Sequence, residues 1–166
     1  MTDEDSSRSI DENGFAAGTA GTQVAMLAQY VKDLSFENPN APNSLQEMAD
    51  KKPEISVNVQ VNARSLGTEG YEVSLNISAV AKVEKKTAFL VELDYAGIFG
   101  VRHIDDQQLE QLLLVECPRI MFPFARRILS DATRDGGFPP LLLDPMDFGQ
   151  LYQQQKSTLP AGERPN

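Results

Sequence analysis

The sequence predicts an α+β domain, because strand-like patterns fill its middle and helical patterns follow them. Between Pro53 and Tyr95, apolar and polar residues alternate in three runs that are separated by short polar turns. Such alternation is typical of half-buried strands, and short connections predict that the strands pair antiparallel. From Asp105 to Leu129, apolar residues recur at helical spacing. The length of 166 residues suits one domain.

Each of the three strand runs places its apolar residues on a single face. These residues are Ile55, Val57, Val59, Val61 and Ala63; Tyr71, Val73, Leu75, Ile77, Ala79, Ala81 and Val83; and Phe89, Val91, Leu93 and Tyr95. An earlier segment, residues 23–36, fits both a helical stripe and a strand, so periodicity leaves both structures open. Two prolines follow it in residues 37–43, which predicts an extended surface crossover.

The helical part should begin at Asp105 or Asp106, because a carboxylate there can accept hydrogen bonds from free backbone N–H groups. Pro118 and Pro123 lie inside the helical pattern and predict a kink or an interruption. A Gly-Gly pair ends the pattern. A shorter helix is expected over residues 145–155, with proline at its favoured first position.

The two ends of the chain lack periodic apolar residues. We expect residues 1–21 and 157–166 to be disordered, with a folded domain over residues 22–156. The chain has 15 Lys and Arg against 24 Asp and Glu, a net charge of −9, which argues against binding to nucleic acid or to anionic membranes. The longest strongly apolar run, residues 112–115, is too short to span a bilayer, and the acidic start does not resemble a secretory signal. A cytoplasmic protein is expected.

Candidate catalytic residues are few, since the chain has one cysteine, Cys117, and one histidine, His103. A single thiol forms no internal disulfide and fits a reducing compartment. One His and one Cys supply none of the zinc-binding patterns, and no phosphate-binding or dinucleotide-binding motif occurs. We therefore expect no enzyme activity, no metal and no cofactor. A small hydrolase or isomerase that uses Cys117 and His103 stays open as an alternative.

Six segments, in this order, resemble the SecB family of protein-export chaperones. They are KDLSFENPNAP (32–42), TAFLVE (87–92), AGIF (96–99), CPRIMFPFAR (117–126), GFPPL (137–141) and PMDF (145–148). The similarity extends from Val24 to Gln155. The resemblance implies a four-stranded antiparallel sheet with two helices packed on one face, and makes residues 23–36 the first strand.

The resemblance also implies a function: a chaperone that holds unfolded precursor proteins in the cytoplasm, without ATP, and delivers them to the motor protein SecA. It implies a homotetramer, a dimer of dimers, whose interface includes Phe89, Val91, Leu93 and Tyr95. The SecA-binding positions it implies are Asp33, Glu37, Leu90 and Glu92, and the zinc of that complex belongs to SecA. The implied client-binding groove contains Phe36, Leu45, Met48, Phe138, Met146, Phe148 and Tyr152.

This chain departs from the family at the crossover. Members often have a tryptophan there, whereas this chain has none, and Met48 is the candidate substitute. A holdase of the same fold that serves another client, such as an antitoxin, is the nearest alternative function.

Overall fold

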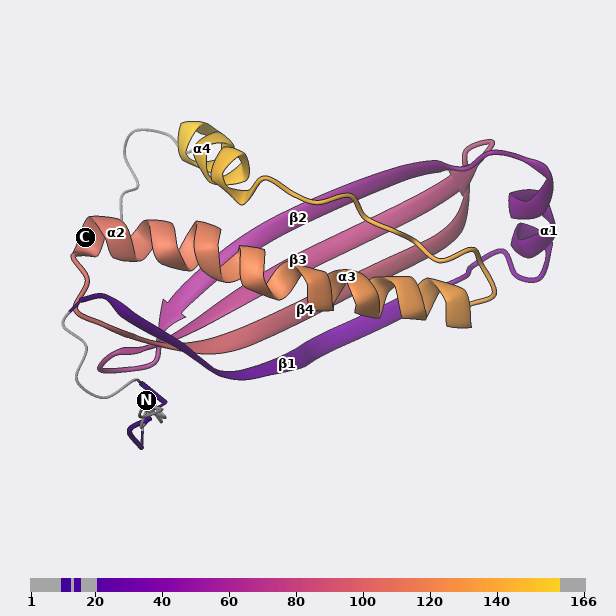
Figure 1. The fold of residues 1–166 in the computed structure, drawn as a ribbon. Helices are drawn as coiled ribbons and strands as arrows, with labels where there is room; N and C mark the ends of the chain where they lie inside the picture. The colour runs from indigo at the N-terminus through magenta and orange to yellow at the C-terminus, as the bar shows by residue number, and fades with distance from the viewer. Residues whose placement is uncertain (1–9, 13, 16–20, 159–166) are drawn as a thin grey trace, which may run out of the picture.

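A four-stranded antiparallel sheet forms one layer of the molecule, and helices cover one of its faces (Figure 1). The computed structural model describes residues 10–12, 14–15 and 21–158. The strand order is β1-β4-β3-β2. The strands are β1 (Gln23–Glu37), β2 (Glu54–Ser65), β3 (Gly70–Val83) and β4 (Lys86–Arg102). The predicted fold class is confirmed.

The segment that fitted both a helix and a strand is the edge strand β1. It pairs antiparallel with β4, and Gln23 lies opposite Arg102 at one end of the pair. The register shifts twice along β1, at Leu27 and at Lys32. Each extra residue moves the following side chains to the other face. The two shifts explain why strict alternation alone did not identify this strand.

A short helix, α1 (Asn43–Asp50), lies in the crossover between β1 and β2, where the sequence predicted an extended connection. The hydroxyl of Ser44 is buried and donates a hydrogen bond to the side chain of Asn38. Strand β1 ends at Glu37, and turns over residues 39–42 lead into α1, so the prediction of an extended crossover is wrong. The helix has eight residues and no side-chain cap, so it left little signal in the sequence.

The helical part begins at Asp105 as predicted, because its carboxylate accepts a hydrogen bond from the backbone N–H of Gln108 at 2.8 Å. Three helical segments follow one another: α2 (Asp106–Gln111), η1 (Leu112–Glu116) and α3 (Cys117–Asp135). The predicted interruption is the π-helical turn η1, directly before Pro118 at the start of α3. Pro123 lies inside α3 and does not end it.

The last helix, α4 (Phe148–Thr158), begins later than predicted. The carboxylate of Asp147 accepts a hydrogen bond from the N–H of Gln150 at 3.0 Å and so caps its first turn. Ser157, which was predicted to belong to a disordered tail, lies in the last turn of this helix. The remainder of that predicted tail, residues 159–166, lies outside the described residues.

The core lies between the sheet and α3. Side chains of β3 and β4 that point toward the helices, such as Leu75, Ile77 and Phe89, are buried against Met121 and Leu129 of α3. Removal of this apolar surface from water is the main term that stabilises the fold.

We call the face of the sheet that faces away from α3 the outer face. The side chain of Phe15, within the predicted disordered arm, is buried there and is 4% exposed. A Cβ atom on Gly97 would approach Met121 of α3, whereas a Cβ atom on Gly100 would overlap the Phe15 ring, so Phe15 and α3 lie on opposite faces. Most of the predicted arm, residues 1–9, 13 and 16–20, lies outside the described residues.

Candidate functional site: an apolar groove and an acidic face

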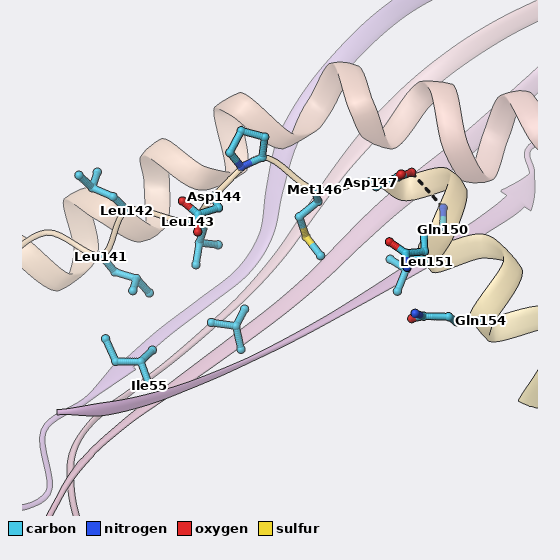
Figure 2. A pocket seen from close by; sticks show the side chains of 12 residues that line it. Ile55, Leu141, Leu142, Leu143, Asp144, Met146, Asp147, Gln150, Leu151 and Gln154 are labelled. Atoms are coloured by element: carbon cyan, nitrogen blue, oxygen red, sulfur yellow. Dashed lines mark hydrogen bonds between the residues drawn. The ribbon is translucent and has the colours of Figure 1, made fainter.

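An open groove of about 540 Å³ lies between the edge strand β2 and the segment that connects α3 to α4 (Figure 2). Ile55 and Val57 of β2 form one wall. Residues 141–147 and the start of α4 form the other wall. This volume is in the range of sites that bind small molecules or a few side chains of a polypeptide.

The groove exposes large apolar side chains to solvent. Ile55 and Val57 are 43% and 42% exposed, and Leu142 is 75% exposed. Met146 adds a flexible thioether, and Leu151 contributes from α4. Adjacent apolar side chains in contact with water favour the binding of an apolar ligand, and methionine adapts to ligands of different shape.

Helix α3 holds the connecting segment in place. The backbone N–H of Leu141 donates a hydrogen bond to the buried hydroxyl of Thr133 at 2.9 Å, and that hydroxyl donates to the carbonyl of Leu129 at 3.0 Å. Further along, the guanidinium of Arg126 donates to the carbonyl of Leu143 at 3.4 Å. The second wall of the groove is therefore fixed from beneath by α3.

Of the seven predicted groove residues, Met146 alone lines this groove. Phe148 is 1% exposed and packs edge-on against Phe122 of α3, at 5.6 Å between ring centroids. It supports α4 from below and has almost no surface left for a ligand. Tyr152 is half-buried on α4, where the amine of Lys156 lies 4.9 Å from the ring centroid and donates to its hydroxyl.

The other four predicted groove residues gather at the crossover end of the sheet. Phe36 and Phe138 pack with Phe89 in an aromatic cluster, with ring centroids 5.1 to 6.2 Å apart. Phe138 is buried and Phe36 is half-buried. Leu45 is exposed on α1, and Met48 packs against the core. The segment that forms the groove wall follows Phe138 of this cluster along the chain and runs to α4 (Figure 1), so it links both sets of predicted residues.

The groove residues that the sequence did not single out come from β2, from the connecting segment and from α4. Ile55 and Val57 belong to the alternating row of β2, which predicted burial. Leu141, Leu142 and Leu143 form an apolar run between prolines and the last helix. An apolar run inside a connection was the available signal, because connections are usually polar.

The outer face carries the four predicted SecA-binding positions together. Asp33 of β1 lies opposite Asp94 of β4, and Glu37 lies opposite Leu90. Glu92 is exposed on the same face, opposite Ser35. The sheet thus brings these four residues, which are far apart in the sequence, to one surface.

A polar depression of about 350 Å³ on this face is lined by Asp33, Glu92 and Asp94, among other residues. Asp94 was not predicted as a site residue. One of its carboxylate oxygens, Oδ1, is buried without a hydrogen-bond partner among the described residues. Carboxylates directly opposite one another repel, so a cationic partner would relieve the repulsion between Asp33 and Asp94. We call Asp33, Glu92 and Asp94 the acidic patch.

The row that was predicted to face a second copy of the chain is buried within one chain. Phe89, Val91, Leu93 and Tyr95 are 1%, 0%, 2% and 6% exposed. Their surface is already covered by the chain's own core, so this prediction needs correction. Exposed apolar side chains lie elsewhere. Outside the groove they include Leu27, Val31 and Leu34 of β1 and Ile120 and Phe124 of α3, each between 43% and 50% exposed.

The candidate catalytic residues have unlike surroundings. Cys117 is fully buried, and this burial raises the pKa of its thiol to about 12. His103 is exposed at the end of β4. Among the described residues, no group of three or more His, Cys, Asp or Glu side chains could hold a metal ion. No helix in the described part of the chain is long and apolar enough to cross a membrane.

An α+β fold with an open apolar groove on one face can bind apolar parts of a ligand, and comparison with known proteins identifies the family. The family model described as preprotein translocase subunit SecB matches residues 17–158. The chain belongs to the SecB family.

Curated relatives support this assignment along the whole chain. The chain is 51% identical to the protein-export protein SecB of Parvibaculum lavamentivorans over 169 residues, which cover 100% of both chains. It is 46% identical to the protein-export protein SecB of Xanthobacter autotrophicus over 144 residues, 87% of this chain and 92% of that protein.

A solved structure shares the fold. It is a SecB-like chaperone of Mycobacterium tuberculosis in complex with a peptide from an antitoxin. The TM-score is 0.63 at 12% identity, and the match covers 74% of this chain and 90% of that chain.

Proposed function

We propose that this protein is an ATP-independent chaperone that holds unfolded precursor proteins in the cytoplasm and delivers them to SecA for export. The observation that carries the proposal is the open groove between β2 and residues 141–147, with its exposed aliphatic walls. An unfolded polypeptide exposes apolar side chains, and a groove without fixed polar partners can bind many such sequences.

The groove and the aromatic cluster at the crossover bind different parts of a client polypeptide. The groove takes aliphatic side chains along β2, and the exposed Leu45 beside half-buried Phe36 offers a second contact at the crossover. The wall segment joins both, so a bound client runs along it. Phe148 and Phe138 act beneath this surface, as supports for the wall.

SecA binds to the outer face of the sheet, opposite the groove, when the client is delivered. The acidic patch attracts a basic segment of SecA, while apolar client segments bind on the helix side. The zinc ion of that segment is bound by SecA, and this chain needs no metal or other cofactor. A chaperone that binds two partners on opposite faces can hold a client while it docks on the motor.

Assembly into a homotetramer buries the exposed apolar side chains of β1 and α3. Val31 and Leu34 lie on an edge strand, where unpaired backbone groups also favour pairing with another chain. Phe124 adds an exposed aromatic ring on α3. We place the interface on these residues, in place of the buried row of β4.

An enzymatic role for Cys117 finds no support, since a thiol with a pKa of about 12 is neutral at pH 7 and nucleophilic cysteines react as thiolates. An antitoxin is the second candidate client, because the solved SecB-like chaperone holds an antitoxin peptide. Export clients are favoured by the names of the curated relatives, which are protein-export proteins.

The test is a binding titration with a denatured precursor protein. Ile55→Glu and Val57→Glu place a charge in the groove, and we expect each to weaken client binding roughly tenfold, which corresponds to about 1.4 kcal/mol. Leu66→Glu is the matched control, because Leu66 is 44% exposed but lies in the turn after β2. Equal affinities for all three variants and the unmodified chain would exclude the groove as the client site.

A further inference from the structure

The N-terminal segment places one aromatic ring in a cradle on the outer face of the sheet. Phe15 is 4% exposed, although it precedes the first strand by several residues. Its ring lies against Gly100 of β4, where any Cβ atom would overlap it. Arg102 also belongs to β4, and its guanidinium lies 4.2 Å from the centroid of the Phe15 ring. Glycine supplies the space and arginine supplies a cation over the ring.

Arg102 is itself fixed by two carboxylates. Its Nη1 lies 2.8 Å from Oδ2 of Asp11, and its Nε lies 2.7 Å from Oε2 of Glu69. The other oxygen of Asp11 accepts a hydrogen bond from the backbone N–H of Phe15 at 3.0 Å. Asp11 therefore joins the cradle to the segment that fills it, and Glu69 holds Arg102 in position from the β2–β3 turn.

The cradle is built from the sheet, whereas its occupant is not. Gly100, Arg102 and Glu69 belong to strand β4 and to the turn beside it. Phe15 and Asp11 come from a segment outside the strand and helix framework, and seven residues, 16–22, separate Phe15 from β1. Strand β4 pairs with β1 on one side and with β3 on the other, and Asp11 and Phe15 reach the sheet through side-chain contacts to Arg102 and Gly100. We therefore expect the strands to stay paired when Phe15 leaves the cradle.

We propose that this cradle is a second polypeptide-binding site, on the face opposite the apolar groove, and that the chain's own N-terminal segment occupies it as an internal competitor. The ligand it fits is a polypeptide turn with an aromatic residue four positions after an acidic one, because Asp11 and Phe15 are the ends of a turn in which the backbone N–H of Asp11 donates to the carbonyl of Phe15 at 2.8 Å. The ring fills the space over Gly100, and the carboxylate pairs with Arg102. An external ligand of this chemistry binds when Phe15 leaves.

The short connection to β1 explains why the cradle is filled. A tether of a few residues gives an effective concentration in the millimolar range. When only a small fraction of the molecules has an empty site, the apparent affinity for an external ligand equals the intrinsic affinity multiplied by that fraction. An external ligand is therefore expected to bind the unmodified chain roughly tenfold or more weakly than a chain with an empty cradle.

The experiment uses the full chain and a synthetic peptide of residues 9–17, SIDENGFAA. Phe15→Ala empties the cradle without shortening the chain. Isotope-labelled protein is titrated with the peptide, and the backbone amide signal of Gly100 reports binding. We expect the peptide to bind the Phe15→Ala chain at least about tenfold more tightly than the unmodified chain.

Two controls make the result specific to the cradle. A peptide with alanine in place of Phe15 should not bind, and Arg102→Met added to Phe15→Ala should abolish binding of the original peptide. Adding Ile55→Glu, which alters the groove, should leave peptide binding unchanged, so this test is independent of the proposed client site. If the peptide binds the Phe15→Ala chain no better than the unmodified chain, or fails to bind it, the cradle is only a packing contact and the proposal is wrong.

Discussion

The carboxylate of Glu72 on β3 accepts a hydrogen bond from the phenol of Tyr30 on β1, although β4 lies between these strands. Lys32 of β1 and Arg64 of β2 bind the same carboxylate, at 3.1 Å and 2.9 Å. A single side chain that is 6% exposed therefore connects both edge strands across the outer face. Removal of the negative charge of Glu72 should therefore weaken contacts to both edge strands, β1 and β2.

We expect Glu72→Gln to lower the free energy of unfolding at pH 7 by about 2 kcal/mol, because it weakens hydrogen bonds to a charged group. The hydrogen bonds from Arg64 and Tyr30 lower the pKa of Glu72 from 4.5 to about 2. A lowered folded-state pKa means that the stabilisation is complete above pH 4.5 and is lost as the pH falls toward 2. Urea denaturation should show that the free energies of unfolding of Glu72→Gln and of the unmodified chain differ less at pH 3 than at pH 7.

Glu54→Gln is the control for this measurement, since Glu54 is exposed at the start of β2. It should change stability little at either pH. A Glu72→Gln effect of the same size at pH 7 and pH 3 would contradict the assignment of the pH dependence to Glu72.

The groove wall should loosen when Thr133 loses its hydroxyl. Thr133→Val removes the acceptor of the buried N–H of Leu141 and should cost about 1–3 kcal/mol of stability. Hydrogen exchange at Leu141 should accelerate with it. Thr133→Ser keeps the hydroxyl and should preserve the slow exchange at Leu141. Equal protection in the Val and Ser variants would show that this hydrogen bond does not hold the wall.

The proposed assembly depends on apolar side chains outside the core. Phe124→Glu charges the exposed face of α3 and should lower the association constant at least about tenfold, as measured by native mass spectrometry. Phe124 is 45% exposed, so the variant should still fold. Leu66→Glu adds the same charge in a turn and should leave the assembly intact. A monomeric unmodified chain would rule out the tetramer.

Charge reversal in the acidic patch should separate the two proposed partners. Glu92→Lys is expected to weaken SecA binding and leave the affinity for a denatured client unchanged, because Glu92 and the groove lie on opposite faces. SecA binding should also weaken as salt rises, since exposed charges are screened beyond roughly 8–10 Å at physiological ionic strength. Asp106→Lys on α2 carries the same change in charge and should have little effect. Parallel loss of both affinities in Glu92→Lys would contradict the division between the faces.

The sequence predicted the regular parts of this fold well. Ile55 to Tyr95 alternates with period two, and Asp105 offers a cap at the right place, so these elements follow from local rules. Segment 23–36 was open because the shifts at Leu27 and Lys32 break its period. Helix α1 left little signal because an eight-residue helix depends on its tertiary contacts.

The groove was harder to predict, because burial depends on which strand lies at the edge. Val57 and Val91 have the same apolar character in the same pattern. Val91 is fully buried on a central strand, whereas Val57 is 42% exposed on the edge strand β2. The aromatic residues of the family motifs, such as Phe148, marked the neighbourhood of the groove, but they lie under its wall.

The buried state of Cys117 makes the protein easy to label. This chain has one native thiol, and it lies in the core with a pKa of about 12. A cysteine introduced on the surface, for example at Ser157, would carry nearly all of a spin label or a dye under native conditions. Distances between copies, or between chaperone and client, can then be measured with the natural residue in place.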